Sequence, residues 1–390
     1  MDNISIDETR EKCDIANTYV KKAIADEYNF ESEGANGYFF DCGENIDIGL
    51  AELGLKRSYI NNRRYLGNKY SLSDFIRETV ENNCNDINIV CDIFSGTGAV
   101  ANSFKDKTLI TNDLLYSNYI SNYAWFASED YCSKKIVKIV HGYNQLKTSE
   151  KNYMRDNFAD TFFSADDCSK IGYIREDIEN KYHSEEINFK EYAILITALL
   201  YGMDKIANTV GHYDAYRKNA KFDRELVLNV LLPEKNTNNN SCYNVDANDL
   251  IKSIKCDLLY LDPPYNSRQY CDAYHLLENV ARWEKPAVFG IARKMDRTAL
   301  KSDYCKITAA KAFEELVKHA KAKYILLSYN NMSDKGNERS NAKISDDDIF
   351  RILGEKGNLK VFESDYKSFS TGKSNIRDNK ERLFLCEVSG

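Results

Sequence analysis

The sequence is poor in proline and lacks any long apolar run. Only four of its 390 residues are proline, and two of these are adjacent, at Pro263 and Pro264. No apolar segment approaches the roughly 18 residues that a membrane-spanning helix requires, and the N-terminal segment is acidic where a signal peptide is basic and then apolar. We therefore expect a cytoplasmic protein with no membrane partner, and the paired prolines single out one short, rigid loop.

The cysteines lack the spacing of a disulfide framework or a zinc site. The eleven cysteines are odd in number, scattered, and never form a CxxC pair, so we expect reduced thiols and no metal. With 43% hydrophobic residues the chain can bury a substantial core, which excludes wholesale disorder. The net charge of −7 excludes less, because an acidic chain can still present a local basic surface to a nucleic acid.

Apolar runs that end in a polar or acidic turn alternate with longer stretches, as in a parallel sheet that is buried on both faces. The predicted strands are residues 88–94, 108–113, 242–246, 257–262, 324–330, 359–366 and 382–388. The connection between the last two is too short for a parallel crossover, so we expect an antiparallel hairpin at a sheet edge. Ser345 before three aspartates indicates a helix N-cap, and Gly357 stands where a C-terminal glycine cap is expected. The predicted fold class is α/β, doubly wound and mainly parallel.

The interval 127–240 interrupts this alternation and is helical in pattern. A crossover between neighbouring strands needs far fewer residues. We therefore predict that 127–240 is an inserted helical domain between two parts of the main domain, 61–126 and 241–390. Residues 1–60 are polar, and we treat them as an N-terminal extension of unknown role.

The first predicted strand runs into a loop that contains Gly96 and Gly98 and then into a helix. Glycines at these positions let the backbone approach a ligand closely, although a short GxG also occurs in plain strand-to-helix turns. The next strand ends in Asp113, whose carboxylate can accept both hydrogen bonds of a ribose diol or can simply cap a helix. Because the third glycine of the dinucleotide fingerprint is missing, S-adenosylmethionine fits this loop better than NAD.

The run Asp262-Pro263-Pro264-Tyr265 follows a buried strand. The prolines stiffen the loop and remove its N–H donors. The Asp262 carboxylate and the Pro263 carbonyl can therefore accept two hydrogen bonds from an exocyclic amine, while the Tyr265 ring stacks on the base. Such acceptors favour the pyramidal amine whose lone pair points at a methyl donor.

These motifs resemble those of a known family. Residues 262–265 look like the catalytic DPPY motif of methyltransferases that act on N6 of adenine in DNA, and residues 92–98 look like their S-adenosylmethionine motif. Residues 65–69 (YLGNK) resemble the YLGxK element that opens the alpha class of the DNA adenine methylase family. The three elements also follow one another in the order of that class.

The FokI-like branch of type IIS modification methylases is more similar still. The similarity lies in residues 262–270 (DPPYNSRQY), 274–278 (YHLLE), 207–213 (ANTVGHY) and 327–331 (LSYNN). It covers residues 60–390, roughly, and leaves the first 60 outside. Tyr329 in the last of these segments is expected on the floor of the site.

The resemblance implies a site-specific DNA adenine-N6 methyltransferase that takes the methyl group from S-adenosylmethionine and flips the target adenine out of double-stranded DNA. The implied catalytic residues are Asp262, Pro263, Pro264 and Tyr265. The implied cofactor contacts are Tyr65, Lys69, Asp92, Phe94, Ser95, Gly96, Thr97, Gly98, Asp113, Asp246, Ala247 and Asp262. The predicted DNA contacts are Arg63, Arg64, Asn208, His212, Tyr213, Arg217, Lys218, Lys221, Arg268 and Arg293. The inserted domain would recognise the target sequence, and a cognate restriction endonuclease is the predicted protein partner.

Other interpretations stay open at this point. Asp246 also fits an ordinary helix cap and Lys69 a solvated lysine, whereas His212 and His275 are poor candidates for a base that this reaction does not need. An RNA amino-methyltransferase would share the DPPY loop but would not account for YLGNK or the insertion. Cytosine-N4 methylases usually have serine in place of Asp262. A DNA-binding protein without turnover is expected to have a broken catalytic loop, and this loop is intact.

Overall fold

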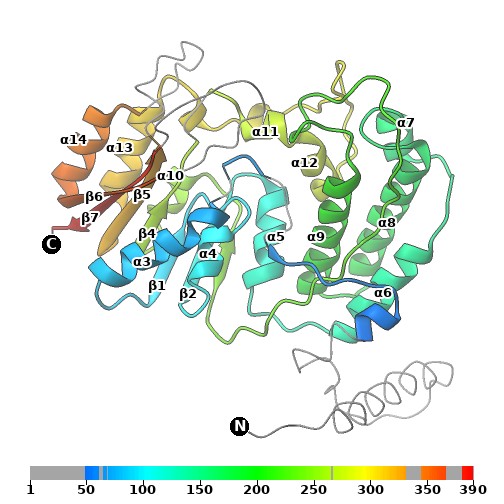
Figure 1. The fold of residues 1–390 in the computed structure, drawn as a ribbon, viewed down its shortest axis with the longest axis horizontal. Helices are drawn as coiled ribbons and strands as arrows, with labels where there is room; N and C mark the ends of the chain where they lie inside the picture. Colours follow the sequence, from blue (N-terminus) through cyan, green and yellow to red (C-terminus); the bar gives the residue numbers. More distant parts are fainter. Residues whose placement is uncertain are drawn as a thin grey trace, which may run out of the picture.

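The computed structural model describes residues 49–60, 65–67, 69–264, 267–330, 344–365 and 380–389. Its centre is a seven-stranded sheet with the order β3-β2-β1-β4-β5-β7-β6 (Figure 1). The strands are β1 (Ile89–Asp92), β2 (Thr108–Asn112), β3 (Ser241–Tyr243), β4 (Leu258–Leu261), β5 (Tyr324–Asn330), β6 (Gly357–Asp365) and β7 (Lys380–Val388). Each predicted strand is present, with ends that differ by a few residues from the prediction.

The five neighbouring strands β3, β2, β1, β4 and β5 pair in parallel, and β7 runs antiparallel to both of its neighbours, β5 and β6. The predicted antiparallel hairpin and the mainly parallel, doubly wound α/β class are therefore confirmed. The strand order reverses direction between β1 and β4, which lie side by side. In open sheets of this kind, ligands bind beyond the carboxyl ends of the strands at such a switch point.

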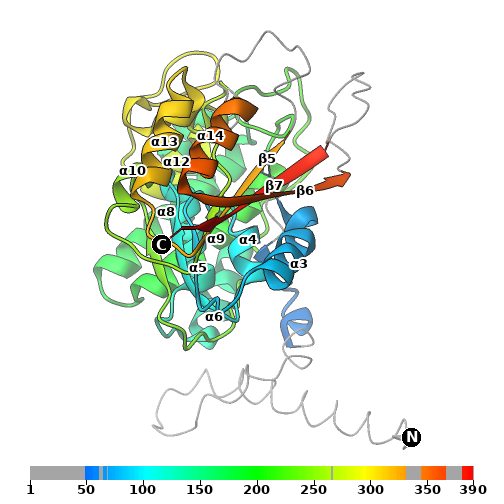
Figure 2. The ribbon, with the colours of Figure 1, turned by 90° about the vertical axis from the view of Figure 1, so that its left-hand side faces the viewer.

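Helices cover both faces of the sheet, which explains why its strands are apolar throughout. Val90 and Leu258 face one side and pack with α3 (Ser73–Asn83) and α4 (Ala99–Ser103). Leu259 faces the other side and packs with α10 (Ala247–Leu250), α13 (Ala309–His319) and α14 (Asp346–Lys356). Figure 2 shows α13 and α14 on one side of the strands and α3 and α4 on the other.

The interval 127–240 is helical as far as Ile206, as its pattern predicts. It holds α6 (Ser133–Gln145), α7 (Tyr153–Phe158), α8 (Ala165–His183) and α9 (Phe189–Ile206). These helices share one hydrophobic core with α5 (Tyr116–Phe126) and α12 (His275–Arg282), through residues such as Ile120, Leu195 and Leu277. Figure 1 shows α5 standing between the sheet and this helical part. The core is continuous, and a domain boundary at residue 127 stays a prediction.

The end of the predicted N-terminal extension belongs to the folded body. Leu50 and Leu55 are buried in the same core as α9, and the Ser58 amide donates to the Val230 carbonyl at 2.7 Å. Residues 1–48 lie outside the described part of the chain. Within the part that is described, no helix is long and apolar enough to cross a membrane.

Both predicted caps of α14 are present. The Ser345 side chain accepts from the Asp348 amide, which confirms the N-cap. Gly357 is the C-cap residue and its amide donates to the Leu353 carbonyl, which confirms the predicted cap position, although its φ of 173° is extended and not left-handed. The glycine is required there because a Cβ would overlap the carbonyl oxygen of Glu387 on β7.

Candidate active site

A cleft opens where β1, β2, β3 and β4 end. Eleven of the twelve cofactor contacts that the resemblance implies line it, namely Tyr65, Lys69, Asp92, Phe94, Ser95, Gly96, Thr97, Asp113, Asp246, Ala247 and Asp262. Gly98 lies in the same loop, one residue beyond Thr97. The structure thus brings together residues that the sequence separates widely, and their roles toward a ligand stay predictions.

The loop after β1 needs its two glycines for its backbone. Gly96 and Gly98 have φ angles of 50° and 79°, in the left-handed region that side chains disfavour. A Cβ on Gly98 would also lie only 2.7 Å from Cε2 of Phe126. The Gly98 amide donates to the Ser95 carbonyl at 2.7 Å, which closes the turn.

Asp113 braces this glycine loop from the end of β2. One carboxylate oxygen accepts from the Gly96 amide at 2.9 Å, and the other accepts from the Leu115 amide at 2.8 Å. Burial raises the pKa of Asp113 to about 6 against the effect of these hydrogen bonds. Each oxygen retains acceptor capacity, so contact with a ribose is compatible with the bracing role and stays a prediction.

Asp92, at the end of β1, is 2% exposed, and its Oδ1 has no hydrogen-bond partner among the described residues. Burial raises the pKa of Asp92 well above its ordinary value, and the nearby charge of Asp262 raises it further. An unsatisfied buried carboxylate oxygen is costly. Asp92 therefore offers an acceptor for a cationic or N–H group in the cleft.

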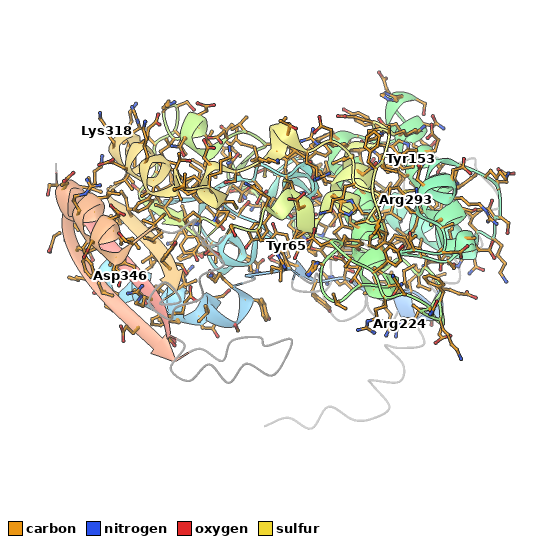
Figure 3. The ribbon with its side chains drawn as sticks, turned by 90° about the horizontal axis from the view of Figure 1, so that it is seen from above. Tyr65, Tyr153, Arg224, Arg293, Lys318 and Asp346 are labelled. Carbon is orange, nitrogen blue, oxygen red and sulfur yellow. The ribbon has the colours of Figure 1, made fainter. Side chains whose placement is uncertain are left out.

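Tyr65 lies between the sheet and the helical part (Figure 3). Its ring stacks on Tyr270 and Tyr274, with centroid distances of 5.4 and 4.5 Å. Asn118 on α5 donates to its hydroxyl at 2.9 Å. The Tyr274 hydroxyl accepts from the Leu66 amide at 2.7 Å, which fixes this segment against the loop that follows Asp262. Nothing in the sequence predicts this stack, because Tyr65 is far along the chain from Tyr270 and Tyr274.

Lys69 is 5% exposed and is not a solvated lysine. Its Nζ lies 3.1 Å from Oδ1 of Asp262 and 3.3 Å from Oε1 of Glu381 on β7. Burial raises the pKa of Asp262 to about 6; Lys69 opposes this effect, and Glu381 adds to it. Glu381 also accepts a hydrogen bond from Ser328 on β5 at 2.8 Å. Sequence reasoning missed Glu381 and Ser328, because nothing in their local pattern relates them to Asp262.

The rest of the catalytic loop is only partly described. Pro263 is buried, Pro264 lines the cleft, and Tyr265 lies outside the described residues. Asp246 lines the cleft as predicted, and it also caps α10 by accepting from the Asn248 amide at 2.8 Å. Tyr329 was expected on the floor of the site, but it does not line the cleft. It is buried, and its hydroxyl accepts from the Ile344 amide.

The predicted DNA contacts fall into three groups. Those exposed on the surface are Arg217, Lys218, Lys221, Arg268 and Arg293. Arg63 and Arg64 lie outside the described residues. The third group makes contacts within the protein: Asn208 and His212 are partly exposed, and Tyr213 is buried.

The contacts of this third group explain its position. The Asn208 amide group donates to the carbonyls of Thr161 and Arg217, at 2.8 and 2.9 Å. Nδ1 of His212 lies 3.8 Å from the Asp214 carboxylate. Tyr213 is 2% exposed and its hydroxyl donates to Asp204, so its predicted contact with DNA is corrected to a packing role.

The segment Tyr274 to Glu278 has a structural role behind the site. His275 is fully buried, and its Nε2 lies 2.9 Å from the Tyr213 carbonyl. The buried Glu278 carboxylate accepts from the amides of Tyr116 and Ser117 at the start of α5, at 2.9 and 2.8 Å. Sequence reasoning did not identify this cap, because it joins helices that are distant in the chain.

The comparisons with known proteins agree with this geometry. The family model for D12 class N6 adenine-specific DNA methyltransferases matches residues 65–338, more than half of the chain. Type II methyltransferase M.NlaIII of Neisseria lactamica is 32% identical over 81% of this chain and 95% of that protein.

Two further relatives are longer proteins. Modification methylase StsI of Streptococcus sanguinis is 32% identical over 82% of this chain, and type II methyltransferase M.FokI of Planomicrobium okeanokoites is 30% identical over 83%. The chain spans about half the length of these two relatives, 50% and 52%.

Proposed function

The chain belongs to the family of D12 class N6 adenine-specific DNA methyltransferases, and on this premise we propose that it methylates N6 of adenine at a specific site in double-stranded DNA. A member of a methyltransferase family requires a methyl donor, and we propose S-adenosylmethionine. The observation that supports the proposal best is that the DPP loop and the glycine loop line the same cleft. Methyl donor and acceptor would meet there.

The adenine amine is a poor nucleophile, because its lone pair is delocalised into the ring. We assign the Asp262 carboxylate and the Pro263 carbonyl as acceptors for its two protons. These hydrogen bonds favour the pyramidal nitrogen and aim its lone pair into the cleft. Lys69 keeps Asp262 in a fixed position at 3.1 Å. After transfer the amine proton is acidic and passes to Asp262 or to solvent.

The residues of the cleft fit S-adenosylmethionine in charge and shape. The unpartnered Oδ1 of Asp92 offers an acceptor to an ammonium group, and Asp113 and Asp246 offer acceptors to hydroxyl and amino groups. The left-handed Gly96 and Gly98 keep the loop free of side chains where a ligand would approach. When bound, this donor supplies an electrophilic methyl group.

The target adenine must leave the duplex to reach Asp262, at a cost of a few kcal/mol. Exposed arginines and lysines offset this cost through contacts with DNA phosphates. We propose that Arg217, Lys218, Lys221, Arg268 and Arg293 make such contacts, and that helices within 127–240 recognise the sequence. The relatives named above are modification methylases, so a restriction endonuclease of the same specificity is the proposed partner. The cytoplasmic location stays a prediction.

The test is incubation of the full chain with labelled S-adenosylmethionine and unmethylated DNA of mixed sequence, with RNA in parallel, followed by nucleoside analysis. We expect N6-methyladenine in DNA, and Asp262→Ala should abolish it while cofactor binding persists. Asp249→Ala removes an exposed carboxylate near the same cleft and should have no effect. Label in RNA alone, or N4-methylcytosine in DNA, would refute the proposal.

A further inference from the structure

A buried ion cluster connects the catalytic loop to the antiparallel strand β7. Lys69 is 5% exposed and Glu381 is 3% exposed, and the lysine lies within 3.3 Å of both Asp262 and Glu381. The two carboxylates reach Lys69 from different strands of the sheet, since Asp262 follows β4 and Glu381 belongs to β7. Nothing in the motifs of the sequence predicts a role for Glu381.

A single lysine beside Asp262 would not be held in place by that contact alone, because its long side chain has many rotamers. The second carboxylate gives the ammonium group a fixed position between two charges. Ser328 in turn orients Glu381 through its 2.8 Å hydrogen bond. A buried ion cluster is costly to disturb, because removal of one partner leaves the remaining charges less well compensated.

Resting on the proposed function, we propose that Glu381 is a positioning residue for methyl transfer, which holds Lys69 against Asp262 and so fixes the carboxylate that accepts the adenine amine. Glu381 touches neither DNA nor cofactor in this role. It acts through Lys69, and its effect appears in the rate of transfer and in its dependence on pH.

The charged and titratable groups that face Asp262 come from each element packed around it. They are Lys69, Glu381, Asp92 and Tyr260. Lys69 favours the ionised form of Asp262, and Glu381 disfavours it. Because an acceptor carboxylate must be ionised, the rate should fall as the pH drops through the pKa of Asp262, which is about 6.

The test is the pH profile of single-turnover methylation between pH 5 and 9, in full-length variants at saturating S-adenosylmethionine. The acid limb of the profile is the pH range in which the rate falls as Asp262 is protonated. Lys69→Met removes the favourable charge, so the acid limb of this variant should move up by about 1 to 3 pH units. Glu381→Gln removes the unfavourable charge but also frees Lys69 from its second carboxylate, so the two effects on the pKa of Asp262 oppose each other and any shift should be smaller than in Lys69→Met. The rate of Glu381→Gln at pH 8 should fall several-fold, because Lys69 loses its second anchor.

Two variants separate this role from a merely structural one. Glu387→Gln makes the same charge change at an exposed end of β7 and should leave profile and rate unchanged. Ser328→Ala removes only the hydrogen bond to Glu381, so it should lower the rate without moving the acid limb.

Wild-type inactivity on every nucleic acid would refute the proposed function itself. An active wild type whose rate at pH 8 is unchanged in Glu381→Gln would overturn the role of Glu381. Should Glu381→Gln not fold, Ser328→Ala provides the test, because it removes the hydrogen bond that orients Glu381. A Ser328→Ala rate at pH 8 equal to that of the wild type would then overturn the proposal.

Discussion

The substitution Gly98→Ala tests whether the glycine loop is shaped by its backbone. Gly98 has a φ of 79°, and an L-residue in the left-handed region costs roughly 1–2 kcal/mol. The new Cβ would also lie 2.7 Å from Cε2 of Phe126, and overpacking of a buried site costs about 1–3 kcal/mol more. We therefore expect a loss of about 2–5 kcal/mol in the free energy of unfolding, together with weaker binding of S-adenosylmethionine.

Two further glycines provide matched controls for denaturant unfolding and cofactor titration. Gly54 also has a left-handed φ of 68° but has open space around its Cβ position, so Gly54→Ala should show the backbone cost alone. Gly354 is in α14, again with open space, and Gly354→Ala should stabilise the protein by about 0.5–1 kcal/mol. Equal losses for Gly98→Ala and Gly54→Ala, with cofactor affinity intact, would refute the explanation from close packing.

Two other predictions concern pH and DNA. Burial lowers the pKa of His275 to about 4, below its unfolded value, so its neutral form contributes stability that is complete above about pH 6.5 and lost as the pH falls towards 4. The wild type should therefore lose up to about 3 kcal/mol of unfolding free energy on that path, and His275→Gln should lose less in denaturant titrations at pH 4.5 and 7.5. Arg293→Ala should weaken DNA binding and reduce by about one the slope of log affinity against log salt concentration. Lys318 is far from Arg293 in Figure 3, and Lys318→Ala should change neither quantity. Equal effects of the two substitutions on DNA affinity would contradict the assignment of Arg293.

The sequence predicts the sheet well, because buried parallel strands leave a strong local pattern. The runs before Asp92 and Asp262 are apolar on both faces, and the structure confirms both as central strands. The meeting of the glycine loop and the DPP loop follows from the rule that parallel strands end at the same edge. This part of the site therefore needed no knowledge of side-chain contacts.

Contacts between distant segments could not be predicted in this way. Tyr213 lies in a polar stretch and was expected at the DNA surface, yet it is buried with its hydroxyl on Asp204. Glu381 lies near the start of β7, the second strand of the hairpin, and the alternation of that strand says nothing about Lys69. In both cases the partner is chosen by tertiary packing, and local periodicity records only that a residue is polar.

The segment 274–278, behind the catalytic loop, supports the cleft through Glu278 on α12. Glu278 caps the first turn of α5, which fixes the helix. Asn118 and Asn122 are four residues apart on α5 and therefore share one face of it. Asn118 donates to the hydroxyl of Tyr65, and Asn122 donates to the hydroxyl of Ser95 in the glycine loop. The α12 carboxylate thus acts on both walls of the cleft through one rigid helix, although it contacts neither wall itself.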